Sequence, residues 1–179
     1  LCVITLIAGV ALSGVYELTK EAIEEQKLAA EAESYRVVCP GAEEFSSDAD
    51  LDAIVHGLGD AIYGTGFGKV HINKVIVGKN TAGENVGYII KVTTRDGFDG
   101  DIVMSVGFDL EGVITGLEFT EINETAGMGM LCAEPEFKDQ FIGDDVDGYV
   151  LNKAGGSTDP EQIDSVSGAS ISSGAVVNA

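Results

Sequence analysis

A serine-rich segment near the carboxyl end carries the residue types best suited to chemistry. Between Asp164 and Ser173 it places five hydroxyl groups around Gly168 and Ala169. If Ser170 begins a helix, its hydroxyl and the free N–H groups of the first turn point to one spot, which favours phosphate. The alternative is a serine-rich loop that caps a helix and binds nothing. The spacing alone leaves both interpretations open.

A second glycine cluster, at residues 123–130, offers a different surface. Glu124 and Thr125 precede Gly127 and Gly129 at the end of a predicted strand. Because glycine has no Cβ, backbone N–H groups there can approach a flat or anionic ligand closely. The alternative is a simple chain reversal, for which glycine is the usual residue.

The strands that position these clusters follow from a period of two that begins at Val70. Residues rich in β-branched side chains predict strands at 70–77, 86–94, 102–108 and 113–119. Turn residues at 97–100 and 109–112 separate the last three strands, which indicates an antiparallel meander.

Helical segments surround this meander. We expect a helix at 134–141 with Pro135 in its first turn, a strand at 149–152, a loop through 155–157 and a final helix from about Ser170. The stretch 45–63 is ambiguous, with residues 46–48 as a candidate helix cap. The resulting fold class is α+β, in one domain over 41–179.

The first residues predict a membrane anchor. Residues 1–16 carry no charge, but a bilayer span needs about 20 apolar residues. We therefore expect a single transmembrane helix over 1–18 that begins upstream of Leu1. A cleaved signal peptide is the alternative, but the helical pattern continues over 19–40 as a stalk that stops at Cys39-Pro40-Gly41.

Charge after this span indicates its orientation. Glutamates predominate over Lys20, Lys27 and Arg36, so the segment lacks the Lys and Arg excess of a cytoplasmic loop. We expect a single-pass protein of the cell membrane whose soluble domain lies outside the cytoplasm.

Composition excludes several classes of function. The chain has 30 acidic and 10 basic residues and a formal net charge of −20, whereas nucleic acids are bound by clustered Lys and Arg. Cys2, Cys39 and Cys132 form no CxxC pair, so we expect no zinc site and no iron–sulfur cluster. Cys39 and Cys132 could pair with each other, but we favour free thiols. No catalytic base or nucleophile–histidine pair is apparent, so we expect a carrier that is not catalytic alone.

Taken together, the segments resemble a known family. Asp-x-x-Ser-Gly-Ala-Ser at 164–170 resembles the flavinylation motif of the FMN-binding domain found in the G subunit of the Rnf electron-transport complex and the C subunit of the sodium-translocating NADH:quinone oxidoreductase. Residues 97–102 and 124–129 resemble two further segments of this family, the second being its flavin-contacting loop. Residues 137–141 and the anchor are similar to the Rnf branch.

The resemblance implies that FMN is attached covalently, by a phosphoester, to Ser170. It assigns contacts with the flavin to both glycine clusters and to the turn before them, with the following residues: Gly97, Phe98, Glu124, Thr125, Gly127, Met128, Gly129, Asp164, Ser167, Gly168, Ala169, Ile171 and Ser172. Asp164 is expected to help a flavin transferase position its metal and activate the hydroxyl. For Met128 and Met130 we expect core packing rather than contact with the flavin ring.

The implied function is electron transfer. The chain is expected to relay electrons within an Rnf-type ferredoxin:NAD oxidoreductase coupled to ion transport, with the other subunits and a flavin transferase as partners. Two alternatives remain: the C subunit of the sodium-translocating quinone reductase, and a membrane-anchored assembly module without a redox role.

Overall fold

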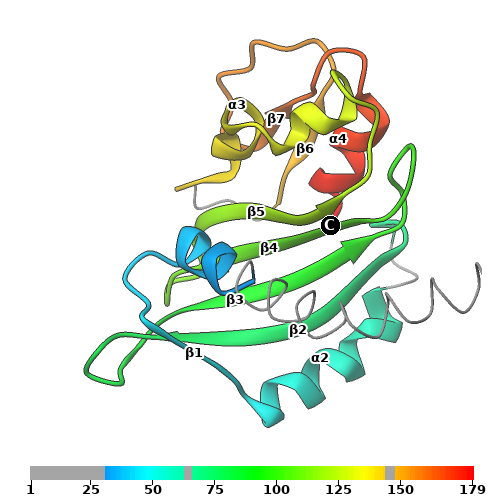
Figure 1. Cartoon of the computed structure of the whole chain (residues 1–179). Coiled ribbons are helices and arrows are strands. Elements are labelled where there is room, and N and C mark those ends of the chain that lie inside the picture. The colour runs from blue at the N-terminus through cyan, green and yellow to red at the C-terminus, as the bar shows by residue number, and fades with distance from the viewer. Residues whose placement is uncertain (1–30, 63–65, 144–147) are drawn as a thin grey trace, which may run out of the picture. The chain divides into compact units, whose positions relative to one another are not determined.

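The computed structural model describes residues 31–62, 66–143 and 148–179 (Figure 1). The chain divides into two units, Leu1–Glu33 and Ser34–Ala179, and the second contains every element from β1 to α4. The expected anchor over 1–18 and most of the expected stalk lie outside the described residues. Residues 31–38 are helical and the helix ends before Pro40, as predicted. Within the described ranges, every helix is too short or too polar to span a bilayer.

Five strands form one antiparallel sheet in chain order. They are β1 (Glu44–Ser47), β2 (Val70–Lys79), β3 (Asn85–Thr94), β4 (Ile102–Phe108) and β5 (Ile114–Ile122). The predicted antiparallel meander is confirmed, and the turns predicted at 97–100 and 109–112 separate β3, β4 and β5. The sequence did not indicate β1, because its four residues are mostly exposed and carry no alternation.

The ambiguous stretch resolves into β1 and helix α2 (Ala49–Ile62). Asp48 caps the helix: its Oδ1 accepts the N–H groups of Asp50 at 2.9 Å and Leu51 at 3.3 Å. The cap predicted within residues 46–48 is therefore Asp48.

The two faces of the sheet carry separate apolar clusters. Val92 and its cross-strand neighbour Met104 belong to one cluster, which also holds residues of the carboxyl-terminal segments. Ile89, three residues from Val92 and therefore on the opposite face, packs with Tyr35 and Val38 in the other. Cys39 lies in this second cluster and Cys132 in the first, and both thiols are free and buried.

Glycines let the end of the 31–38 helix approach the sheet closely. Gly78 faces Gly87 and Gly107 faces Gly116 across neighbouring strands. A Cβ at Gly78 or Gly87 would lie 2.9 or 3.0 Å from Cys39 Sγ, and one at Gly116 would lie 2.8 Å from Val38 Cα. Thr115 Oγ1 donates a hydrogen bond of 2.5 Å to the Val38 carbonyl and holds the end of the helix against the sheet.

Short elements of the carboxyl-terminal half gather beside β5 (Figure 1, yellow to red). They are η1 (Gly129–Ala133), α3 (Pro135–Lys138), η2 (Asp139–Phe141), β6 (Val150–Asn152), β7 (Gln162–Asp164) and α4 (Ser170–Val177). The α+β class is confirmed. Pro135 lies in the first turn of α3, as predicted.

Two predictions for this half need correction. The single helix expected at 134–141 is two pieces, because α3 tightens into the 3₁₀ turn η2 where Gln140 bonds the backbone of Asp164. The loop after β6 contains an unpredicted strand, β7, which pairs with β6 in parallel. A three-residue strand has too short a pattern to be visible in sequence.

Candidate functional site

One pocket of about 410 Å³ collects residues from three separate segments. The turn between β3 and β4, the loop after β5 and the start of α4 contribute its ten lining residues, which are Phe98, Glu124, Thr125, Met128, Gly129, Gly168, Ala169, Ser170, Ile171 and Ser172. All ten are among the residues assigned from the sequence. Distant segments thus meet at one place, with a volume in the range of ligand pockets.

Helix α4 presents its amino-terminal end to this pocket. Gly168 has a φ of +78°, a left-handed conformation that favours glycine and turns the chain into the helix. Ser170 is the first helical residue, as predicted, and the first helical hydrogen bond is donated by Ser173 to the Ala169 carbonyl at 2.9 Å. The N-cap residue, Ala169, makes no side-chain capping bond, so the N–H groups of the first turn of α4 remain as donors.

The serines of the motif have different surroundings. Ser172 and Ser173 are buried, and their hydroxyls serve internal bonds to Glu124 and from the Val166 N–H. Ser167 is exposed outside the pocket lining. Ser170 is half-buried in the lining, with Ser165 Oγ donating to its hydroxyl at 3.3 Å. Ser170 is therefore the serine that combines access with a place at the helix start.

Glu124 joins the three segments of the pocket. Its side chain is buried, Oε1 accepts the Phe98 N–H at 2.8 Å, and Oε2 accepts the Ser172 hydroxyl at 3.0 Å. A Cβ at Gly97 would lie 2.6 Å from Oε1, and one at Gly129 would lie 2.7 Å from Oε2. Both positions therefore require glycine for packing, and the carboxylate shapes the pocket wall.

The mouth of the pocket is apolar and open. Phe98, Met128 and Ile171 expose 65%, 48% and 58% of their surfaces. The expectation that Met128 and Met130 fill the core is wrong, since Met130 is also 36% exposed. They lie where the chain enters η1, whose buried residues are Gly129 and Cys132.

Four of the assigned residues, Gly97, Gly127, Asp164 and Ser167, do not line this pocket. Gly97 supports it through Glu124, and Gly127 has a φ of +74° that allows the turn before Met128. Asp164 lies on the other side of the motif, in the lining of a second pocket.

The Asp164 carboxylate is held by the loop after β6. It accepts the Asn152 amide at 2.6 Å and the N–H groups of Gly156 and Ser157. Burial raises the pKa of Asp164, but the bonds from Ser157, Asn152 and Gly156 outweigh it, so the pKa lies below its usual value. Sequence reasoning did not find these partners, although the glycine pair at 155–156 marked a loop.

Cys132 is buried next to Ser173 of α4. Its Sγ is 3.7 Å from Ser173 Oγ. Burial raises the pKa of the Cys132 thiol, the bond with Ser173 lowers it, and the nearby Glu124 carboxylate raises it, with a net rise. In the described ranges, no three or more His, Cys, Asp or Glu side chains come close enough to hold a metal ion.

These features fit a flavin nucleotide. Uncapped N–H donors and the positive end of a helix dipole suit a phosphate group, and exposed apolar side chains beside them suit a flat ring system. The Ser170 hydroxyl lies at the phosphate end of this arrangement.

Comparison with known proteins shows which family the pocket-forming part of the chain matches. Residues 97–179, which include every residue of the pocket, match the FMN-binding domain family. This part of the chain belongs to that family, and the predicted resemblance is confirmed.

Proteins similar to this chain over nearly its full length include G subunits of ion-translocating complexes. The chain is 29% identical over 181 residues to the G subunit of the Na(+)-translocating ferredoxin:NAD(+) oxidoreductase complex of Acetobacterium woodii, covering 99% of this chain and 84% of the relative. It is 29% identical over 178 residues to the G subunit of the ion-translocating oxidoreductase complex of Methanosarcina acetivorans, covering 99% and 85%. The chain is thus similar to these G subunits along nearly its full length.

Solved structures give weaker matches. NqrC of Shewanella oneidensis aligns with a TM-score of 0.49 at 22% identity, over 59% of this chain and 52% of that one. The C subunit of the Na(+)-translocating NADH-quinone reductase of Parabacteroides distasonis aligns with a TM-score of 0.48 at 26% identity, over 57% and 54%.

Proposed function

We propose that the Ser170 hydroxyl carries FMN through a phosphoester. The observation that carries this proposal is the accessible serine at the uncapped start of α4, inside a pocket that three segments form together. When bound, FMN supplies the ability to accept and pass on electrons.

Different residues of the chain bind the phosphate and the ring of FMN. The N–H groups of the first turn of α4 bind the phosphate, and the helix dipole favours its negative charge. Phe98, Met128 and Ile171 offer apolar surface to the ring. Glu124 keeps these segments together through Phe98 and Ser172.

Formation of the ester requires a separate enzyme. The group that hydrogen-bonds to the Ser170 hydroxyl is another hydroxyl, Ser165, which is too weak a base to activate it. The Asp164 carboxylate is bound to Asn152 and to the loop at 156–157. We therefore infer that a flavin transferase supplies the base and any metal, with Asp164 shaping the motif that it recognises.

We further propose that the chain is the electron-carrying G subunit of an Rnf-type ion-translocating oxidoreductase. The similarity to known G subunits over 99% of the chain supports this role. The uncharged residues 1–16 support anchoring over 1–18, and the acidic flank supports a domain outside the cytoplasm. A covalent bond suits that location, because a lost cofactor is not replaced there from a cellular pool.

The test is in-gel fluorescence of the full chain produced in a host with a flavin transferase. We expect a fluorescent band that survives denaturation, disappears in Ser170→Ala, and persists in Ser46→Ala, an exposed serine of β1 outside the motif. Mass analysis of the peptide with Ser170 should show the mass of FMN less one water. A dark wild-type band, or flavin retained in Ser170→Ala, refutes the attachment.

A further inference from the structure

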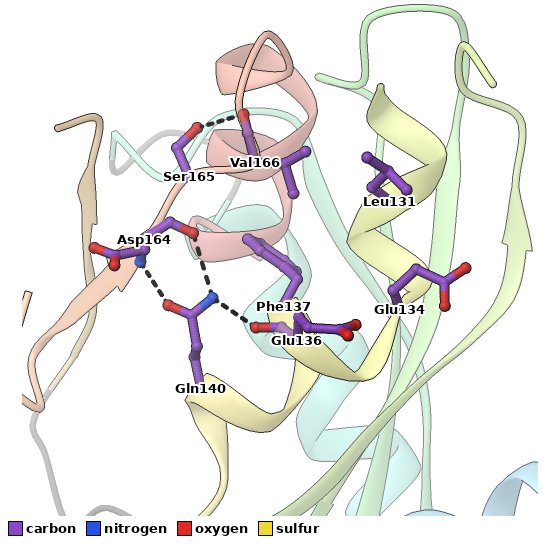
Figure 2. A pocket seen from close by; sticks show the side chains of 8 residues that line it. All are labelled: Leu131, Glu134, Glu136, Phe137, Gln140, Asp164, Ser165 and Val166. Atoms are coloured by element: carbon purple, nitrogen blue, oxygen red, sulfur yellow. Dashed lines mark hydrogen bonds between the residues drawn. The ribbon is translucent and has the colours of Figure 1, made fainter. Parts of the chain in front are cut away.

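A second pocket, of about 520 Å³, lies on the other side of the 164–170 motif (Figure 2). Its lining residues are Leu131, Glu134, Glu136, Phe137, Gln140, Asp164, Ser165 and Val166. None of them lines the pocket of Ser170. The proposed flavin attachment therefore leaves this pocket without a role.

The floor of this pocket is apolar and its rim is acidic. The side chains of Leu131, Phe137 and Val166 turn toward one another in Figure 2. Glu134 and Glu136 are exposed at the edge, and in the described part of the chain neither carboxylate has a hydrogen bond or ion pair. The lining includes no lysine, arginine or histidine. The pocket thus combines an apolar surface with uncompensated negative charge.

We propose that this pocket receives a cationic side chain, arginine or lysine, from a partner protein that docks beside the flavin site. The aliphatic stem of such a residue packs on Leu131, which is 41% exposed and lies beside the buried Phe137, while its charged head meets Glu134 and Glu136. Arginine fits best, because its planar head pairs with carboxylates. A second copy of this chain is a poor occupant, because its formal net charge is −20.

The pocket walls are held in place before anything binds. Gln140 Oε1 accepts the Asp164 N–H at 2.7 Å, and its Nε2 donates to the Glu136 carbonyl at 3.2 Å (Figure 2). Gln140 therefore fixes the distance between α3 and the start of the motif. A preformed wall lowers the ordering cost of binding.

The occupant of this pocket lies next to the flavin site. Ser165 lines the second pocket, and its hydroxyl donates to Ser170 of the first at 3.3 Å. The Leu131 N–H donates to the carbonyl of Met128, which lines the first pocket, at 2.9 Å. A partner anchored here therefore covers the exposed apolar mouth around Met128.

The test uses the uniformly ¹⁵N-labelled full chain and two small probes in amide NMR titrations. N-acetylarginine amide carries the cation, and N-acetylcitrulline amide has nearly the same shape without the charge. We expect the arginine probe to shift the amide signals of Leu131, Glu136 and Val166 in a saturable manner, at least fivefold more tightly than the citrulline probe. Added salt should weaken binding of the arginine probe.

Matched variants separate the pocket from general surface charge. Glu134→Gln with Glu136→Gln should weaken binding of the arginine probe at least fivefold. Glu43→Gln with Glu44→Gln, which changes the same net charge at exposed positions around β1, should leave it unaltered. Equal binding of both probes, equal effects of the two double variants, or shifts spread over the whole acidic surface overturn the proposal.

The titrations are made on the chain both with and without flavin. The arginine pocket does not depend on the ester at Ser170, so we expect binding in both forms. Loss of flavin attachment with retained probe binding refutes the proposed function alone, and the reverse result refutes the docking pocket alone.

Discussion

Glu124 stabilises the candidate site through hydrogen bonds. Its carboxylate accepts the Phe98 N–H and the Ser172 hydroxyl, and it is buried. Hydrogen bonds to a charged acceptor are stronger than those between neutral groups. One side chain therefore connects the β3–β4 turn, the loop after β5 and helix α4.

Removing this carboxylate should destabilise the domain. In Glu124→Ala the Phe98 N–H and the Ser172 hydroxyl lose their acceptor, which costs about 2 kcal/mol of the free energy of unfolding. Glu124→Gln keeps the shape, an acceptor and a donor, so we expect less than about 1 kcal/mol. Urea denaturation followed by circular dichroism measures both.

Glu111→Ala serves as the control for this comparison. Glu111 is exposed on the β4–β5 turn, and such substitutions usually change stability by less than about 0.5 kcal/mol. If Glu124→Ala is as stable as Glu111→Ala, the carboxylate does not join the three segments.

The loop between β5 and η1 leaves no space for a side chain at Gly129. A Cβ there would lie 2.6 Å from Ser172 Oγ and 2.7 Å from Glu124 Oε2. We expect Gly129→Ala to cost about 2 kcal/mol by overpacking. It should also reduce flavin attachment, because Ser172 belongs to the first turn of α4.

The control for Gly129→Ala is Gly112→Ala on the β4–β5 turn. Gly112 has a φ of +94° with open space around its Cβ position, so alanine brings backbone strain of about 1–2 kcal/mol without a collision. Flavin attachment, measured as fluorescence per protein, should fall in Gly129→Ala only. Equal attachment in both variants contradicts the packing argument.

The loop that holds Asp164 predicts a dependence of stability on pH. Burial raises the pKa of Asp164, but the donors Ser157, Asn152 and Gly156 together hold it below its usual value. Because the folded pKa is lower than the unfolded one, the charged carboxylate stabilises the fold above about pH 4. This stabilisation is lost as the pH falls through the folded pKa.

Asp164→Asn should therefore have a lower thermal midpoint than wild type at pH 7, and the difference should shrink toward pH 3. Thermal unfolding across this range measures it. Asp99→Asn, an exposed aspartate in the β3–β4 turn, should follow the wild type at every pH. A constant difference between Asp164→Asn and wild type across the range contradicts the assigned pKa direction.

The elements differ in how far sequence predicts them. Strands β3 to β5 were predictable because each carries an apolar face long enough to show the period of two, with turn residues between them. Strand β7 was not, because it has three residues and pairs with β6 in parallel without a tight turn. The close packing of Val38 and Cys39 against four glycines could not be predicted either, since the sequence does not show that glycines on separate strands lie side by side.

The pocket was easier to predict than its internal bonds. The spacing of small residues and hydroxyls left a phosphate site and a helix cap both open, and the resemblance to the FMN-binding family singled out Ser170 and its neighbours. The hydrogen-bond partners of Glu124 lie 26 or more residues from it in the sequence, and one partner of Asp164, Ser157, lies 7 residues away. At either separation these hydrogen bonds depend on the folded geometry. The exposure of Met128 follows likewise from how η1 turns and not from residue type.

At the scale of the whole molecule, charge is the dominant property. The chain carries 30 acidic and 10 basic residues, so FMN attached at Ser170, as proposed, would lie in a negative field. Reduction that adds net negative charge to the flavin is disfavoured by such a field. Dissolved salt screens it, since the Debye length falls from about 10 Å at 0.1 M to about 3 Å at 1 M.

If FMN is attached at Ser170 as proposed, its midpoint potential should therefore rise with ionic strength. When two electrons add one net charge, each 1 kcal/mol of relieved repulsion raises the potential by about 20 mV. We expect a rise on the order of 20 mV between 0.05 and 1 M potassium chloride, measured by spectroelectrochemical titration of the full chain. Free FMN in the same buffers corrects for the effect of salt on the cofactor itself. If the midpoint potentials of the attached and free flavins shift equally with salt, the charge of the protein does not set the potential. The contacts within the pocket then set it, and Glu124→Gln should change the potential at constant salt.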